Sequence, residues 1–138
     1  MTNLKHYSHK VGTNFWHIEF ATKYLYKMFG KFKQKSIAEA SIRNVCWNHC
    51  IKIHTLFVMP EHVHMRVTLP HNITESKAMQ LIKGGSAYHF FKNHPKSRLR
   101  LPQGHLWSAG GCATTVGYND VETVDNYIRN QAQHHAIA

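Results

Sequence analysis

The chain has 138 residues and a mass of 16.0 kDa, which is the size of one ordinary domain. Its 43% of hydrophobic residues can fill a core, and its 17% of charged residues are too few for a disordered chain. Seventeen lysines and arginines against seven acidic residues give a net charge of +10, which favours nucleic acid as the partner. An acidic protein or an anionic lipid surface would satisfy the same charge. No apolar run approaches the ~20 residues of a membrane span, which argues against a membrane protein.

Cysteine usage and the first residues bear on the cellular compartment. Cys46, Cys50 and Cys112 are an odd number, and residues 1–10 lack the apolar stretch of a signal peptide. We therefore expect reduced thiols and a cytoplasmic protein. Cys46 and Cys50 lie four residues apart with His49 between them, so a zinc site is conceivable there. A buried free cysteine that packs as a small apolar residue is the commoner case.

The first half of the chain predicts a strand, a helix and a hairpin. Aromatic and branched residues alternate with His17 and Glu19 over residues 13–22, which predicts a half-buried strand. Apolar and small residues then follow helical spacing, which predicts a helix over about 33–49. Two β-rich runs, 51–59 and 62–69, are separated only by Pro60 and Glu61. A connection this short predicts an antiparallel hairpin, which we place in the middle of the sheet.

The second half predicts a helix, a strand and a last helix. Thr74 is a plausible N-cap for a helix that ends before Pro95, although Gly84 and Gly85 weaken its centre. Residues 112–118 predict a short strand. Asn119 or Asp120 then caps a helix with an apolar stripe of Val121, Val124 and Ile128.

This order of elements, β-α-β-β-α-β-α, defines the expected fold class. It is α+β, a ferredoxin-like split β-α-β-β-α-β antiparallel sheet with an added C-terminal helix. We expect one domain over residues 1–138, with its core at about 13–131. The fold alone says little about activity.

Two pairs of polar residues have spacings that suit chemistry. His62 and His64 are two apart on a strand, so both imidazoles lie on one face, as metal ligands require. Tyr127 and Gln131 are four apart on the last helix and also share a face. Each pair alone is more often structural, either as polar residues facing solvent or as a partly buried tyrosine. The other eleven histidines, His17 among them, have no spacing that predicts a second site.

Several motifs together resemble one family. The run Met59–His64 (MPEHVH) resembles the His-hydrophobic-His ("HUH") motif of the single-tyrosine transposases encoded by small insertion sequences. Further matches follow in order as LIKGGS (81–86), GHLWS (104–108), TVG (115–117) and YIRNQ (127–131). The resemblance covers roughly residues 13–131. Two departures are Glu61, where the family usually has Asp, and Gly110-Gly111-Cys112, where it often has an aromatic residue.

The resemblance implies a set of roles. His62, His64 and Gln131 would bind a divalent metal, and Tyr127 would be the nucleophile. Two imidazoles and an amide oxygen suit Mg²⁺ or Mn²⁺ better than a closed zinc site. The reaction implied is a transesterification through a 5′-phosphotyrosine, with no nucleotide cofactor. The partners implied are single-stranded DNA with hairpins and a second copy of the chain, in a homodimer whose active sites are shared between chains.

Basic residues provide a surface that can follow a DNA backbone. They fall in two stretches without acidic residues, between Glu19 and Glu39 and between Glu75 and Asp120. A solvated lysine face that only keeps the protein soluble is an equally good interpretation of this pattern. The residues are Lys23, Lys27, Lys31, Lys33 and Lys35 in the first stretch, and Lys77, Lys83, Lys92, Lys96, Arg98 and Arg100 in the second.

Two other functions compete with a metal-dependent transposase. One is a non-catalytic, domesticated module that binds single-stranded nucleic acid. The other is a related tyrosine nuclease that acts on hairpins of chromosomal repeats. The transposase is favoured because His62, His64, Tyr127 and Gln131 occur together, and a binding module would not need all four.

Overall fold

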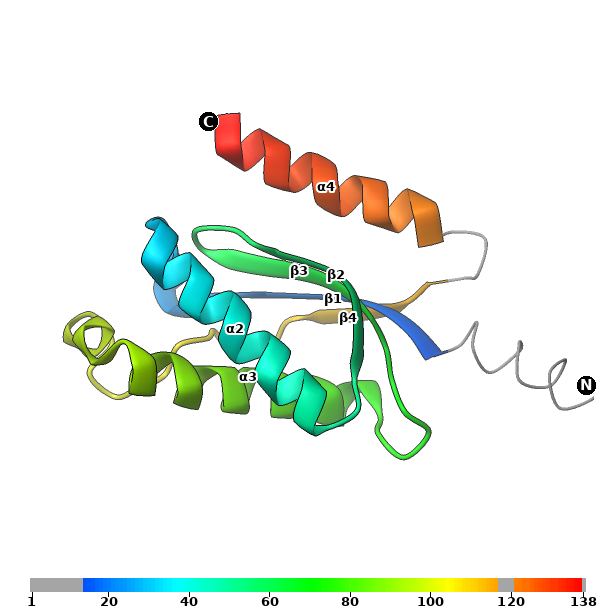
Figure 1. The fold of residues 1–138 in the computed structure, drawn as a ribbon, viewed down its shortest axis with the longest axis horizontal. Helices are drawn as coiled ribbons and strands as arrows, with labels where there is room; N and C mark the ends of the chain where they lie inside the picture. The colour runs from blue at the N-terminus through cyan, green and yellow to red at the C-terminus, as the bar shows by residue number, and fades with distance from the viewer. Residues whose placement is uncertain (1–13, 117–120, 138) are drawn as a thin grey trace, which may run out of the picture.

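In the computed structural model, residues 14–116 and 121–137 are described, and they form a four-stranded antiparallel sheet with helices on both faces (Figure 1). The strands lie in the order β2-β3-β1-β4. They are β1 (Phe15–Ala21), β2 (Lys52–Val58), β3 (His62–Thr68) and β4 (Cys112–Thr115). The helices are α2 (Phe32–Asn48), α3 (Glu75–Asn93) and α4 (Val121–Ile137), with short 3₁₀ turns η1 (Lys23–Leu25) and η2 (Pro95–Leu99).

The expected fold class is confirmed, and one expected position is wrong. The hairpin of β2 and β3 does not lie in the middle of the sheet, because β2 is an edge strand and β1 and β3 are the central pair. The chain crosses through α2 from β1 to the far side of β3, so β1 pairs with β3 and leaves β2 outside. Thr13, Asn119, Asp120 and residues 117–118, all parts of expected elements, lie outside the described residues.

One face of the sheet forms the core. Side chains alternate along β1 and β3, and the apolar set points toward α2 and α3, which lie together on one side of the sheet (Figure 1). The fully buried members from the strands are Ile18, Val63, Met65 and Val67, and those from the helices include Ile42, Ile82 and Phe90.

Gly85 explains why a glycine occurs in the centre of α3. A Cβ at this position would lie 2.5 Å from a methyl group of Val45 on α2, which is too close for any side chain. The glycine therefore allows α2 and α3 to pack closely, and it offsets the loss of helix propensity that the sequence suggested. Thr74 caps α3 as expected, because its side chain accepts a hydrogen bond from the backbone N–H of Lys77 at 3.2 Å.

Helix α4 lies alone on the other face of the sheet (Figure 1). Ile128 is its fully buried anchor, and the Asp125 carboxylate binds Arg66 of β3 through two hydrogen bonds of 2.6 and 3.2 Å. This face of β1 and β3 carries His17, Glu19, His64 and Arg66, with Phe15 at its edge beside Arg66. Among the described residues, no helix has the length and apolar character needed to cross a membrane.

Candidate active site

The two motif histidines lie on β3, on the face covered by α4. Their ring centroids are 4.8 Å apart and their planes are nearly perpendicular, at 79°. His64 is almost completely buried, and the side chain of His62 is about one fifth exposed. The period of two along a strand therefore brings both imidazoles together, as expected.

Each of these imidazoles is held by a carboxylate at Nδ1. His62 Nδ1 lies 2.7 Å from Oε1 of Glu61, its neighbour in the chain. His64 Nδ1 lies 3.1 Å from Oε2 of Glu19, which stands opposite it in the β1–β3 register. A carboxylate only accepts at neutral pH, so Nδ1 carries the proton in both rings. Nε2 is then the nitrogen with the lone pair that a metal would use.

His17 is a neighbour of His64 that the sequence did not reveal. Its Nε2 lies 3.4 Å from His64 Nδ1, and the two rings stack at 5.6 Å with an angle of 14°. The potential ligand atoms of His17, Glu19 and His64 all lie within 4.8 Å of one another, the one such group of three among the described residues. Burial lowers the pKa of His17, and the charge of Glu19 partly opposes that shift.

Helix α4 brings Tyr127 over this cluster. The Tyr127 ring centroid is 5.9 Å from that of His64 and 6.1 Å from that of His17. The tyrosine is 48% exposed, so a ligand can approach this residue from solvent. The Arg66–Asp125 ion pair fixes the helix one half-turn before Tyr127. Gln131 follows one turn later and is half-buried, on the same helix face.

This site therefore combines residues far apart in the sequence: two carboxylate-held imidazoles, a third imidazole and an accessible phenol. A comparison with family models gives a match over residues 10–131, to the model described as "Transposase IS200 like". The chain belongs to the IS200-like transposase family. The family resemblance of the sequence motifs is thereby confirmed.

Two curated members of this family illustrate the similarity. The ISDra2 transposase TnpA of Deinococcus radiodurans is 28% identical over 90 residues, which cover 65% of this chain and 64% of that protein. The match thus spans slightly less than two thirds of that relative. The transposase for insertion sequence element IS200 of Salmonella typhimurium is 25% identical over 118 residues, which cover 86% of this chain and 76% of that protein.

Solved structures share the fold of this family member. A Deinococcus radiodurans R1 protein, solved by crystallography, superimposes with a TM-score of 0.67 at 24% identity, covering 85% of this chain and 89% of that one. A REP-associated tyrosine transposase bound to a REP hairpin superimposes with a TM-score of 0.64 at 18% identity, covering 90% and 70%. Because both sequence identities are below 25%, these two superpositions show a shared fold and nothing further.

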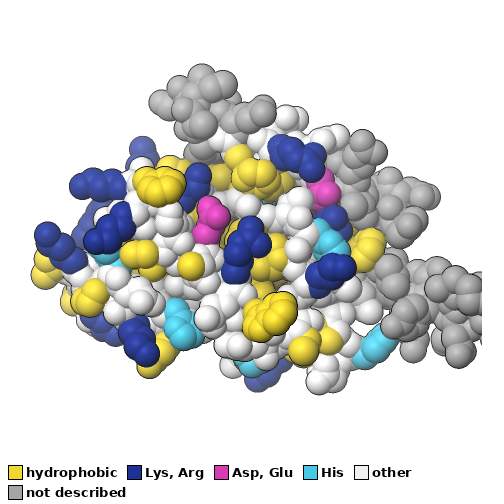
Figure 2. Space-filling view, in the orientation of Figure 1, with side chains coloured by type: hydrophobic (Ala, Val, Ile, Leu, Met, Phe, Trp, Pro, Cys, Tyr) yellow, Lys and Arg dark blue, Asp and Glu magenta, His cyan; other side chains and the backbone are white. Residues whose placement is uncertain are grey.

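The basic residues do not all have the same surroundings. Figure 2 shows Lys and Arg side chains, with hydrophobic ones between them, at the end of the molecule where β1 ends and α2 begins. Lys83, in contrast, donates hydrogen bonds to the carbonyls of Ser108 and Gly110, both at 2.6 Å, and burial lowers its pKa. Lys83 therefore holds the segment before β4, a structural contact that the sequence did not reveal.

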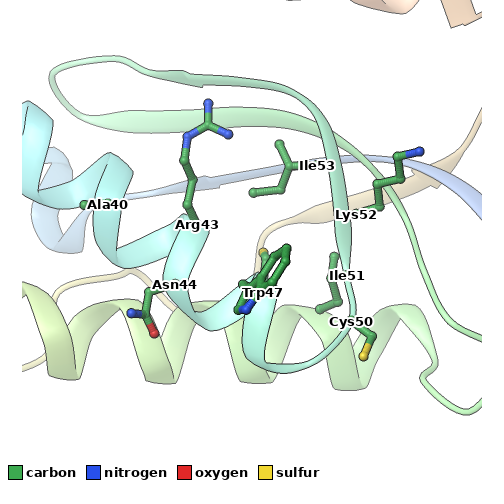
Figure 3. A pocket seen from close by; sticks show the side chains of 9 residues that line it. Ala40, Arg43, Asn44, Trp47, Cys50, Ile51, Lys52 and Ile53 are labelled. Carbon is green, nitrogen blue, oxygen red and sulfur yellow. The ribbon is translucent and has the colours of Figure 1, made fainter.

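A pocket of about 970 Å³ lies away from this site, between the end of α2 and the start of β2 (Figure 3). Trp47, Arg43 and Lys52 are among the residues around it. Cys46 and Cys50 also line it, but they form no group of three potential ligands with His49 among the described residues. Cys46 is buried, which raises its pKa to about 12, so it packs as a small apolar residue.

Proposed function

We propose that this chain is a DNA transposase that cleaves and rejoins single-stranded DNA through Tyr127, with a divalent metal held beside it by His62, His64 and Gln131. The observation that carries the proposal is the position of Tyr127, accessible and 5.9 Å from the ring of buried His64. Family membership supports the same reaction class. We place the protein in the cytoplasm, where its DNA substrate is.

The residues present fit a metal. Glu61 and Glu19 contact Nδ1 of His62 and His64, so the nitrogen proposed to bind the ion is Nε2 of each ring. Such carboxylate–histidine pairs are typical partners of metal sites, because the carboxylate fixes the ring and raises its basicity. Together with the Gln131 amide oxygen, these nitrogens suit Mg²⁺ or Mn²⁺. Glu19 and Glu61 are thus positioning residues.

The chemistry of the bound ion would be Lewis-acid polarisation of the scissile phosphate. The Tyr127 hydroxyl oxygen attacks the phosphorus, so that a phenolic P–O bond forms and the P–O3′ bond breaks. The phenolic proton is balanced by the proton that the leaving 3′-oxygen acquires. The products are a 5′-phosphotyrosine and a free 3′-hydroxyl, which reverses the step when it attacks the phosphotyrosine. Since one ester replaces another, no nucleotide cofactor is needed.

The proposed substrate is single-stranded DNA with hairpins, and the proposed assembly is a homodimer with shared active sites. The net charge of +10 and the basic end of the molecule support a polyanionic substrate (Figure 2). Helix α4 lies over its own chain's His64 here, so shared sites would require α4 of each copy to cover the histidines of the other copy. Two tyrosines are needed to exchange two strands, and a second copy would supply the other.

The test is a covalent-adduct assay. Labelled single-stranded DNA from both flanks of the gene is incubated with Mg²⁺ or Mn²⁺ and then denatured. We expect a metal-dependent protein–DNA adduct with the wild type and none with Tyr127→Phe, which keeps the ring but lacks the nucleophile. Tyr88→Phe is the matched control, because Tyr88 is also an exposed helical tyrosine, and it should form the adduct normally.

The outcomes separate the competing functions. An adduct that persists in Tyr127→Phe would remove Tyr127 from the mechanism. Hairpin binding without any adduct on either flank would favour the non-catalytic module instead. An adduct with repeat hairpins, formed by a monomer, would favour the nuclease.

A further inference from the structure

The loop after β1 has an unusual backbone. Tyr24 and Leu25, in η1, have φ angles of 59° and 55°, in the left-handed region that bulky side chains rarely adopt. Two successive residues of this kind are unfavourable unless the surroundings impose the conformation. Such strain is concentrated at functional sites.

Hydrogen bonds on both sides of the loop impose it. Thr22 is fully buried, its N–H donates to the carbonyl of Glu61 at 2.8 Å, and its hydroxyl donates to the carbonyl of Tyr26 at 2.7 Å. Farther along, the N–H of Phe29 donates to the carbonyl of Pro60 at 3.1 Å. The loop is thus bound to the turn that carries Glu61, the residue that holds His62.

The imposed conformation exposes apolar side chains. Tyr24 is 68% exposed and Leu25 is 63% exposed, although both lie between buried segments. The Tyr26 ring, which is half-buried and packs against the core, lies 5.3 Å from that of Tyr24. Cations accompany both rings, with Lys23 Nζ 5.4 Å from the Tyr24 centroid and the Arg100 guanidinium 4.3 Å from that of Tyr26. We call these five residues the Tyr24 surface.

We propose that the Tyr24 surface stacks on unpaired bases of the single strand beside the active site, an inference that rests on the proposed function. Proteins bind single strands without reading their sequence by stacking bases on an exposed aromatic ring next to cations, as Tyr24 offers here. The charge of the segment around Tyr24 supports this proposal, because residues 20–38 contain five lysines and no acidic residue. Such a surface repels another cationic protein and attracts a polyanion.

The Tyr24 surface also lies close to the motif histidines. Ala21 is paired with His62 across β1 and β3, and Tyr24 follows only three residues later. Three residues span at most about 11 Å, so the surface lies within a few nucleotides of a phosphate bound at the histidines. The Tyr24 surface is therefore within reach of a strand held at the active site.

The test measures binding in a chain that cannot cleave. In the Tyr127→Phe background, fluorescence anisotropy at fixed salt gives the Kd of a fluorescein-labelled oligothymidylate. We expect Tyr24→Ala to raise this Kd by about fivefold or more, the usual cost of losing one stacked base. Tyr24→Phe keeps the ring and should stay within about twofold. Trp47→Ala is the control, because Trp47 is 84% exposed at the C-terminal end of α2, and this variant should bind DNA normally.

Tyr24→Gly separates binding from a structural role. Glycine adopts positive φ readily, so this variant should melt at a higher temperature than Tyr24→Ala while binding DNA as weakly.

An unchanged Kd in Tyr24→Ala, or an equal loss of affinity in Trp47→Ala, would overturn the proposal. So would a change of oligomeric state in Tyr24→Ala by light scattering, since the surface would then be a protein contact. If the wild type forms its adduct and Tyr24→Ala binds normally, only this inference fails. If no DNA binds to any variant and no adduct forms, the proposed function fails as well.

Discussion

The two faces of the central strands differ in almost every respect. On β3, Val63 and Met65 point into the apolar layer under α2 and α3, while His64 and Arg66 point toward α4. Both faces are buried, but only the second buries groups that need partners. Glu19 accepts from His64 and Asp125 from Arg66, so the partners come from other elements.

This difference separates stability from chemistry along one strand. Burial of apolar side chains on the first face supplies most of the folding free energy, because it removes the most apolar area from water. The second face fixes the orientation of polar groups. Substitutions at successive positions of β3 should therefore have different consequences, and the predictions below test this in order of expected size.

The largest effect should come from the apolar face. Met65→Ala removes a fully buried side chain and should lower the free energy of unfolding by about 2–5 kcal/mol. The adjacent variant, His64→Ala, should lose metal binding with a smaller loss of stability. Urea unfolding measures the free energy of unfolding of both variants, and Mn²⁺ titration measures their metal affinity. If His64→Ala lowered the free energy of unfolding as much as Met65→Ala does, the division of roles between the two faces would be contradicted.

The second prediction concerns how α4 is attached. Asp125→Ala leaves Arg66, whose side chain is 8% exposed, without its carboxylate partner, which should cost about 2–3 kcal/mol. Tyr127 would lose its position, so adduct formation should slow more than tenfold. The matched double variant Arg66→Met with Asp125→Leu replaces the ion pair with apolar contact.

Stability should return in the double variant, because no charge is left buried without a partner. Urea unfolding and limited proteolysis of α4 compare the single and double variants. If Asp125→Ala unfolds like the wild type, the ion pair does not hold the helix.

Sequence patterns predicted the elements well because those patterns are local. The helix expected at 33–49 is α2, Phe32–Asn48, and the strand expected at 62–69 is β3, His62–Thr68. The period of two placed His62 and His64 on one face. Neither the edge position of β2 nor the approach of His17 to His64 is local, since both depend on which strands pair. His17 and Glu19 share a face of β1 in the sequence, but only the β1–β3 register brings that face to the motif histidines.

The third prediction tests the carboxylates under the imidazoles. Glu19→Gln should weaken Mn²⁺ binding by about 10- to 100-fold, because an amide can turn either its oxygen or its NH₂ toward Nδ1 and no longer fixes the His64 tautomer. Glu61→Gln should act on His62 in the same way. Isothermal titration gives the affinity, and ¹⁵N NMR of the imidazoles reports whether Nδ1 keeps its proton.

Glu39→Gln is the matched control for these two variants, because Glu39 lies on α2, on the opposite face of the sheet. It removes the same charge from the chain without touching either imidazole, and its Mn²⁺ affinity should equal that of the wild type. An equal decrease in all three variants would assign the effect to net charge.

The smallest effect should be a pH dependence of stability from His54, at the rim of the polar face. Burial lowers the pKa of His54, and the charges of Arg66 and Lys52 act in the same direction. The unfolded chain therefore binds more protons than the folded chain between the lowered pKa and about 6.5, so stability rises with pH in that window and falls on acidification.

The variant that tests this is His54→Gln, which does not titrate. It keeps a donor toward the Thr68 hydroxyl, which His54 Nε2 contacts at 2.6 Å. Between pH 7.5 and pH 5.5 the melting temperature of the wild type should fall further than that of His54→Gln. The difference should be on the order of 1 °C. Identical losses would mean that His54 titrates alike in the folded and unfolded chains, and that its position beside the cations of this face has no effect on stability.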